Sequence, residues 1–346
     1  MKLINKFIPA VLLSLLIGNL ISAQGNDTTL IGKLKETFNG KYFCLSILNR
    51  NAADFQIERS INGYNGFSIL NFRAKISGDM DSSFGYLLRT EFVNSPAILD
   101  AKLYYKFVPM FKIDFGLFKP PFSAEYLVGV ENILFISRSQ AVNVLNSGRE
   151  VGIQFSGETN NKTFSYFGGI FNGNKNFSGN DNNEFLYVMR TEFKLWNCNP
   201  RKSMALIGLN AAQSNDKKIS ILNSDFTGSR FLLGGDINFS MNNLLLSSEV
   251  IWAKLKNSIT GISTRPFGYQ VTAGYNVSQI TQLLLRWDNF KDNIPSGFNK
   301  LFIFGINLFV SKINKLQFNY LIPVNDGKVK HHQFLFNWQF YYEIFK

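Results

Sequence analysis

The chain has 346 residues, of which 45% are hydrophobic, 15% aromatic and 17% charged, and its formal net charge is +12. Its 35 Phe and 13 Tyr exclude a disordered chain, and two Cys are too few for a disulfide scaffold or a multi-cysteine metal module. A mean hydropathy of -0.02 excludes a bundle of transmembrane helices. The two histidines are the adjacent His331 and His332, so we expect no metal and no cofactor.

The N-terminus has the pattern of an export signal. Lys2 and Lys6 make a short positive region, and residues 7–20 form an apolar stretch that is too short to span a bilayer securely. A small-residue cleavage site ends at Ala23, so residues 1–23 are predicted to be a cleaved signal peptide. The alternative is a retained N-terminal anchor helix.

Two regions are expected beyond this signal. Residues 24–40 lack a strand pattern and are predicted to be a periplasmic lead-in, whereas residues 41–346 form one all-β domain in which apolar and polar residues alternate with period two. About sixteen such segments are predicted, at 41–49, 66–77, 82–93, 97–107, 110–118, 149–157, 162–172, 184–195, 202–213, 229–240, 243–255, 266–277, 279–290, 299–310, 313–323 and 331–343.

The connections between these segments alternate in length. Short links such as 78–81 and 311–312 alternate with longer polar ones such as 50–65 and 214–228. Short turns on one rim and long loops on the other are the layout of a transmembrane antiparallel β-barrel, for which about ten residues per strand suffice. We therefore predict a barrel of about 16 strands in the bacterial outer membrane. A soluble β-sandwich or propeller is the alternative, and charges on the polar face of nearly every segment disfavour it.

Aromatic residues gather near the expected strand ends or on the apolar face, as the aromatic girdles of a membrane barrel would require. They are Tyr64, Phe84, Tyr86, Tyr104, Phe118, Trp252, Phe267, Tyr269, Trp287 and Tyr320.

If the apolar face meets lipid, the polar face lines an aqueous lumen. Its basic residues are Arg73, Lys75, Arg89, Lys102, Lys106, Lys112, Arg190, Lys194, Arg230 and Arg286, and its acids are Glu91, Asp100, Asp114, Glu192, Asp236, Glu249 and Asp288. The basic excess favours anions in a pore. The alternative interpretation is that neighbouring opposite charges pair across strands and brace the wall.

The connection 119–148 is too apolar for a free solvated loop, and a segment of this length must pack somewhere. We expect it to fold into the lumen as the third long loop, to narrow the pore, and to present Arg138, with Glu125 and Glu131, to the channel. Alternatively, it caps the barrel mouth or contacts a neighbouring subunit.

Three motifs carry a family resemblance. Gly116-Leu-Phe-Lys-Pro-Pro-Phe-Ser-Ala-Glu-Tyr-Leu127 is followed by Ser137-Arg-Ser139 and by Gly148-Arg-Glu-Val-Gly152. Over about forty residues this pattern resembles the phosphate-selective porin O and P family. The resemblance implies a sixteen-stranded, usually trimeric porin with an inward third loop and a basic lumen, and it puts Lys119, Arg138 and Arg149 on motif positions.

The sequence thus predicts an outer-membrane porin, not an enzyme, through which small anions (phosphate or a similar oxyanion) or polar solutes diffuse. The expected pore-lining and constriction residues are Arg73, Lys75, Arg89, Lys102, Lys106, Lys112, Lys119, Arg138, Arg149 and Arg190. The expected partners are these solutes, outer-membrane lipid and, from the resemblance, two further copies of the chain, with no nucleic acid. The alternative function is a non-conducting barrel that acts as a surface structural or adhesion protein.

Overall fold

The structure is a computed structural model. It describes residues 43–56, 65–175, 179–198, 203–222, 224–292, 299–325, 328–329 and 332–344. The predicted signal peptide (1–23) and lead-in (24–40) lie outside the described residues. Within the described ranges, no helix is long and apolar enough to cross a membrane.

The described residues form one antiparallel sheet of sixteen long strands and two strands of two residues each. The long strands are β1 (Cys44–Gln56), β2 (Gly66–Asp79), β3 (Phe84–Glu91), β4 (Ala97–Val108), β5 (Phe111–Phe118), β6 (Glu150–Glu158), β7 (Phe164–Phe171), β8 (Leu186–Cys198), β9 (Ser203–Ile221), β10 (Ser224–Met241), β11 (Leu244–Asn257), β13 (Phe267–Asn276), β14 (Thr281–Lys291), β15 (Asn299–Phe309), β16 (Asn314–Asn325) and β18 (Gln333–Glu343). The short ones are β12 (Ser263–Thr264) and β17 (Lys328–Val329).

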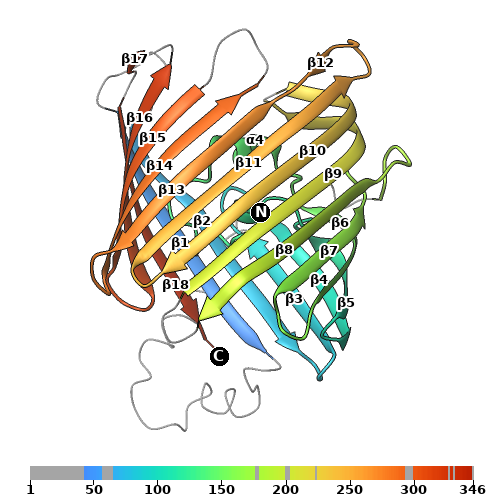
Figure 1. The fold of residues 1–346 in the computed structure, drawn as a ribbon, viewed down its shortest axis with the longest axis horizontal. Coiled ribbons are helices and arrows are strands. Elements are labelled where there is room, and N and C mark those ends of the chain that lie inside the picture. Colours follow the sequence, from blue (N-terminus) through green and yellow to red (C-terminus); the bar gives the residue numbers. More distant parts are fainter. Residues whose placement is uncertain are drawn as a thin grey trace, which may run out of the picture.

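The sheet closes on itself. Each long strand pairs with its neighbours in sequence, and β1 pairs with both β2 and β18, so that Arg50 lies opposite Asn71 on one side and Gln339 on the other. Figure 1 shows the tilted strands of the resulting barrel. The predicted sixteen-strand antiparallel barrel is confirmed.

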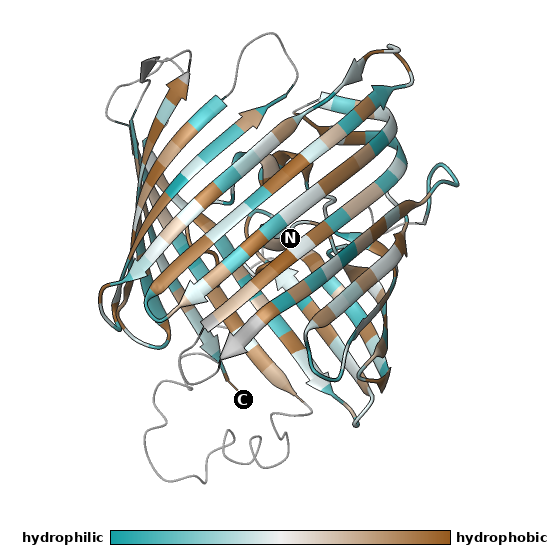
Figure 2. Cartoon of the chain, viewed as in Figure 1, coloured by the Kyte–Doolittle hydropathy of each residue, from teal (hydrophilic) through white to brown (hydrophobic). Residues whose placement is uncertain are grey.

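Side chains alternate between two faces of the wall because successive residues of a strand point to opposite sides. On β11, Glu249 and Ile251 are 3% and 1% exposed, whereas Val250 between them is 39% exposed. The face that carries Glu249 is called the polar face, and the face that carries Val250 the apolar face. The stripes of hydropathy along each strand follow this alternation (Figure 2).

Two regions that the sequence suggested were loops are strands. Strand β1 continues to Gln56, well past its predicted end at residue 49, and β9 and β10 continue through most of 214–228. The polar residues of this hairpin suggested a loop, but Arg230 and Asp216 form a buried ion pair across it at 2.7 Å. Cross-strand pairing and burial therefore outweigh local polarity here.

The connection between β5 and β6 (residues 119–148) contains two short helices, α3 (Ala124–Leu127) and α4 (Gln140–Leu145). The Ser123 side chain caps α3 by accepting a hydrogen bond from the Tyr126 N–H at 3.1 Å. Helix α4 contacts β11, β13 and β14. It lies behind the front strands in Figure 1.

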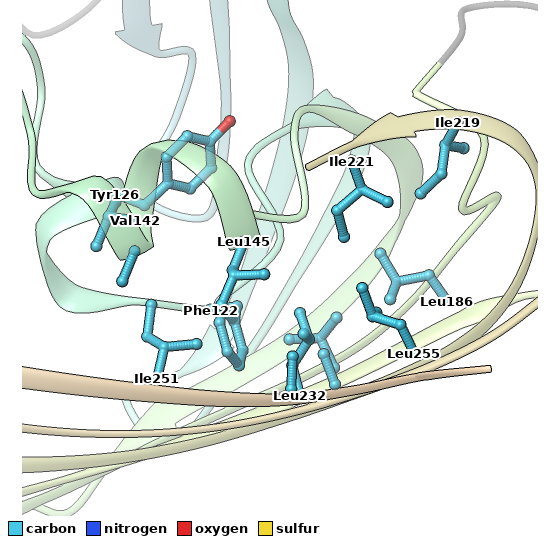
Figure 3. Close-up of a cluster of buried hydrophobic side chains, with 14 of the residues drawn as sticks. Phe122, Tyr126, Val142, Leu145, Leu186, Ile219, Ile221, Leu232, Ile251 and Leu255 are labelled. Atoms are coloured by element: carbon cyan, nitrogen blue, oxygen red, sulfur yellow. The ribbon is translucent and has the colours of Figure 1, made fainter. Parts of the chain in front are cut away.

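This β5–β6 connection packs its apolar residues against the wall, as its composition predicted. Phe122 and Leu145 are 0% exposed and contribute to a core with Leu232, Ile251 and Leu186 (Figure 3). Burial of each such side chain stabilises the fold by about 1.5–3 kcal/mol.

Two predicted girdle residues face the other way. The Tyr104 hydroxyl donates to the Asp79 carboxylate at 2.5 Å, and Phe118 packs edge-on against Phe171 in the core at 5.4 Å. Tyr104 lies within β4, two residues from both Lys102 and Lys106, and Phe118 ends β5 four residues after Asp114. The alternation of each strand therefore places both rings on the polar face.

Candidate functional site

Basic side chains from β1, β2, β3, the β5–β6 connection and the residue that precedes β6 gather on one part of the polar face. We call Arg50, Arg73, Arg89, Lys119, Arg138 and Arg149 the cationic cluster; mutual electrostatic interactions join its members. The neighbouring carboxylates are Glu91, Asp100, Glu125 and Glu131. Six basic side chains against four carboxylates leave an excess of basic groups.

Part of this cluster is braced by ion pairs. Arg73 bonds Glu91 at 2.7 Å, and Asp100 lies 2.9 Å from Arg149 and 3.4 Å from Arg89. A single carboxylate therefore serves two guanidinium groups. Charge-assisted bonds of this kind fix the geometry of side chains that stay partly exposed.

Among the residues that the structure describes, no carboxylate accepts a hydrogen bond from Lys119 or Arg138. The Lys119 ammonium donates to the carbonyl oxygens of Tyr126 and Val128, and Arg138 donates to those of Glu125 and Val128, at 3.0 and 2.7 Å. Both cations lie over the Tyr126 ring, at 4.6 and 5.6 Å from its centroid. Burial, followed by the charges of Arg138 and Arg149, lowers the pKa of Lys119 to about 6.

A second basic group lies nearer the rim of short turns. The ammonium groups of Lys102, Lys106 and Lys112 lie 5.9, 5.0 and 4.6 Å from the centroid of the Tyr104 ring. Asp114 bonds Lys102 and Lys112 at 2.8 and 2.9 Å. This group continues the basic track along β4 and β5.

The part of the polar face formed by β8–β14 is acidic instead. A cavity of about 460 Å³ there lies between these strands and residues 124–134. Its charged lining residues are the acids Glu125, Glu192, Asp236 and Glu249 and the bases Arg190 and Arg286. Basic side chains thus outnumber acids in one arc of the barrel, and acids outnumber bases around this cavity in the other.

Side chains of the wall satisfy backbone groups of the β5–β6 connection. The Glu249 carboxylate accepts from the N–H groups of Ala124 and Glu125, both at 3.0 Å, and Asp288 accepts from the N–H of Gln140 at 2.9 Å. These bonds fix the starts of α3 and α4.

Uncharged amides hold the stretch between the two helices. Asn307 and Gln317 both donate to the Leu134 carbonyl oxygen at 3.0 Å. Asn319 accepts from the Ile136 N–H at 2.8 Å, and Arg50 donates to the Ile136 carbonyl oxygen at the same distance. The connection is therefore attached to the polar face at β1, β11 and β14–β16.

The structure places most of the predicted site residues on the polar face, and most of them form an ion pair with a carboxylate there. Those paired with a carboxylate are Arg73, Arg89, Lys102, Lys106, Lys112, Arg149 and Arg190. Arg190 is 1% exposed and joins the acidic arc, away from the cationic cluster. Within the described part of the chain, the Lys75 side chain makes neither an ion pair nor a hydrogen bond, although its backbone is in the β2 ladder.

Arg50 was missed, because the first strand was predicted to end one residue before it. The roles of Tyr104 and Tyr126 as platforms for cations were missed as well. Lysines two residues away on each side of Tyr104 were the available signal, since residues two apart share a face of a strand.

Three solved structures share this fold. An anion-selective porin from Comamonas acidovorans is 12% identical with a TM-score of 0.63, over 87% of this chain and 98% of that chain. OprB of Pseudomonas putida is 10% identical with a TM-score of 0.66, over 90% and 96%. OmpT, an outer membrane protein of Vibrio cholerae in trimer form, is 12% identical with a TM-score of 0.62, over 87% and 99%. At such identities the likeness shows the fold alone.

The comparison with curated protein sequences finds no match. The family model described as phosphate-selective porin O and P matches residues 49–344, which is most of the chain. The match includes the motifs around Lys119, Arg138 and Arg149. The chain therefore belongs to the phosphate-selective porin O and P family and is an outer-membrane porin.

Proposed function

We propose that this porin prefers anions, which move along the arc of the barrel that carries the cationic cluster. The observation that supports this is the excess of six basic side chains over four carboxylates in that arc; five of the six are arginines, which stay charged at neutral pH. The lysines around Tyr104 extend the positive track toward the rim of short turns. Positive groups lining a pore lower the energy of an anion and raise that of a cation.

The β5–β6 connection forms the constriction of this pore, between the cationic cluster and the acidic arc. The hydrogen bonds between the connection and polar-face residues on β1, β11 and β14–β16 support this assignment. Because Arg138 belongs to the connection itself, joined below pH 6 by a charged Lys119, the connection carries positive charge to the narrowest part of the pore. The acidic arc opposite keeps the anion preference moderate.

Reversal potentials of the purified protein in planar bilayers test the function. In a salt gradient, stable conductance steps with an anion-favouring reversal potential are expected. Cation preference would contradict the role of the cationic cluster. A folded, heat-modifiable barrel without steps would instead favour the non-conducting surface protein. Block by added phosphate would identify phosphate as a bound solute.

Lys119 should make the selectivity depend on pH. Its pKa of about 6 means that the side chain is cationic below pH 6 and neutral above it. The anion-to-cation permeability ratio should therefore be higher at pH 5 than at pH 8. In Lys119→Met, the increase of the permeability ratio from pH 8 to pH 5 should be smaller than in the wild type. The increase that remains is due to carboxylates that become protonated. Lys75→Met, on the same face, is the matched control and should keep the wild-type pH dependence.

We further propose a homotrimer, in which neighbouring subunits cover the wall at β3–β7. Strands β3, β5 and β7 have 8 residues each, fewer than the roughly 9–11 that a tilted strand needs to cross a bilayer. Phe115 in β5 is 59% exposed on the apolar face. Phe115→Arg should dissociate the trimer, as measured by light scattering in detergent. Leu283→Arg on β14 should not, and equal effects of the two variants would contradict this interface.

We also propose that residues 1–23 are removed on export and that residues 24–40 precede the barrel. The intact mass of the outer-membrane protein should correspond to a chain that starts at Gln24. A mass that includes Met1 would contradict cleavage. No catalytic residues are proposed, in keeping with the family, which indicates a channel and not an enzyme.

A further inference from the structure

On the apolar face of β11–β15, three kinds of side chain follow one another from the middle of the strands toward the rim of long connections. Exposed aliphatic or aromatic side chains lie in the middle, at Val250, Val271, Leu285 and Phe304. Toward the rim of long connections, ring-bearing side chains follow at Trp252, Tyr269, Phe267, Trp287 and Phe302. Beyond them lie basic residues on all four neighbouring strands or at their ends, at Lys254, Lys256, Arg265, Lys291 and Lys300.

Strand register places these basic residues on the apolar face. Trp252 lies opposite Phe267, and Lys254 is two residues beyond Trp252 on the same face. Likewise, Lys300 is two residues beyond Phe302, which lies opposite Trp287. Two residues span about 6.6 Å along a strand. The cations therefore lie just outside the aromatic layer, where the headgroup region of a membrane begins.

We call Lys254, Lys256, Arg265 and Lys300 the outer basic patch, and all four are exposed. Their cross-strand neighbours are uncharged: Phe231 for Lys254, Ser229 and Ser263 for Lys256, and Asn289 and Val324 for Lys300. Within the described ranges, no member of the patch forms an ion pair. Asp292 lies beside the patch, next to Lys291.

The other ends of the same strands differ. Toward the rim of short turns, the apolar face of β11, β13, β14 and β15 carries Leu246, Tyr275, Leu283 and Ile306, all exposed and uncharged. The positive charge is therefore confined to one leaflet. In an outer-membrane barrel, the long connections face the cell exterior, so this leaflet is the outer one. Figure 1 shows these strands side by side, with β12 at the rim that carries the patch.

We propose that the outer basic patch binds phosphate groups of lipids in the outer leaflet. Exposed cations at headgroup depth attract anionic lipids, and the aromatic layer beneath them packs against the start of the acyl chains. Lys and Arg on adjacent strands can bind one phosphate from two sides. The site is separate from the pore, because its side chains leave the wall on the face opposite to the cationic cluster.

Native mass spectrometry of the full-length exported protein in detergent micelles tests the proposal, with lipid A, which carries phosphates, and with dephosphorylated lipid A as probes. The test variant is Lys254→Gln/Lys300→Gln. The control variant is Lys162→Gln/Lys312→Gln, which removes the same charge from exposed residues in the short turns of the opposite rim. Heat-modifiability and unit conductance should match the wild type in both, because none of these residues belongs to the pore machinery.

The wild-type protein should bind lipid A more tightly than the dephosphorylated probe. The test variant should lose about 10- to 100-fold in affinity for lipid A, since each cation near a membrane surface contributes about a fivefold gain. The control variant should stay within about twofold of the wild type. Equal binding of the two probes by the wild type, an unaffected test variant, or an equally weakened control variant would each overturn the proposal. A change of oligomeric state in the test variant without lipid would also overturn it, by making this face an interface between copies.

Discussion

Replacing Arg138 with glutamate is expected to shift the channel strongly from anions toward cations. The Arg138 guanidinium donates to the carbonyl oxygens of Glu125 and Val128, and within the described residues no carboxylate forms a salt bridge with it. The substitution changes the charge at the constriction by two units. One unit at 4 Å is worth about 1 kcal/mol in bulk water and more where water is restricted. The anion-to-cation permeability ratio should therefore fall by roughly tenfold or more.

Reversal potentials at low salt measure this shift, because salt screens the added charge. Arg138→Gln should give about half of the shift on a logarithmic scale. Lys162→Glu makes a charge change of the same kind at an exposed turn between β6 and β7 and should leave the ratio near the wild-type value. If Arg138→Glu and Lys162→Glu give the same ratio, Arg138 does not face the permeating ion.

Replacing Asp236 with alanine is expected to give the largest loss of stability. Asp236 and Arg190 pair at 2.6 and 3.1 Å, and each side chain is 1% exposed. Without Asp236, the Arg190 guanidinium keeps only Glu192 as its carboxylate partner. Removing one partner of a buried ion pair costs about 3–5 kcal/mol. The midpoint of urea unfolding should fall accordingly.

Two further variants are needed to interpret the urea midpoint of Asp236→Ala. Asp225→Ala makes the same substitution at an exposed position of β10 and should change the midpoint little. Arg190→Met/Asp236→Ala removes both charges, so it should unfold at higher urea than Asp236→Ala alone. If Arg190→Met lowers the midpoint of the Asp236→Ala variant by as much as it lowers that of the wild type, the two side chains contribute to stability independently. That result would contradict a coupled ion pair.

The barrel and its two faces could be predicted from local pattern. A period of two places alternate side chains on opposite faces, so the sequence predicts most charged residues of 66–77 and 184–195 on the polar face. The packing of the β5–β6 connection followed from composition, because Phe122, Val142 and Leu145 could not remain in water. Export and the family motifs are likewise local features of the chain.

The candidate site was predicted in its residue types but not in its arrangement. Arg50 fell outside the predicted strand, although in the structure it bonds Ile136 in the β5–β6 connection, 86 residues away. Tyr104 was assigned to the membrane girdle, whereas three lysines surround its ring. Gly208 had no evident role, yet a Cβ there would collide with both Arg190 and Asp236.

The alternation of residues along the chain was enough for the strand number, the two faces and the basic excess, because these depend on neighbours in sequence. The pairing of Arg190 with Asp236, the division of the polar face into basic and acidic arcs, and the attachment of 119–148 depend on neighbours in space. Closure of the β1–β18 pair sets the register of the whole wall, and only that register decides which charge meets which.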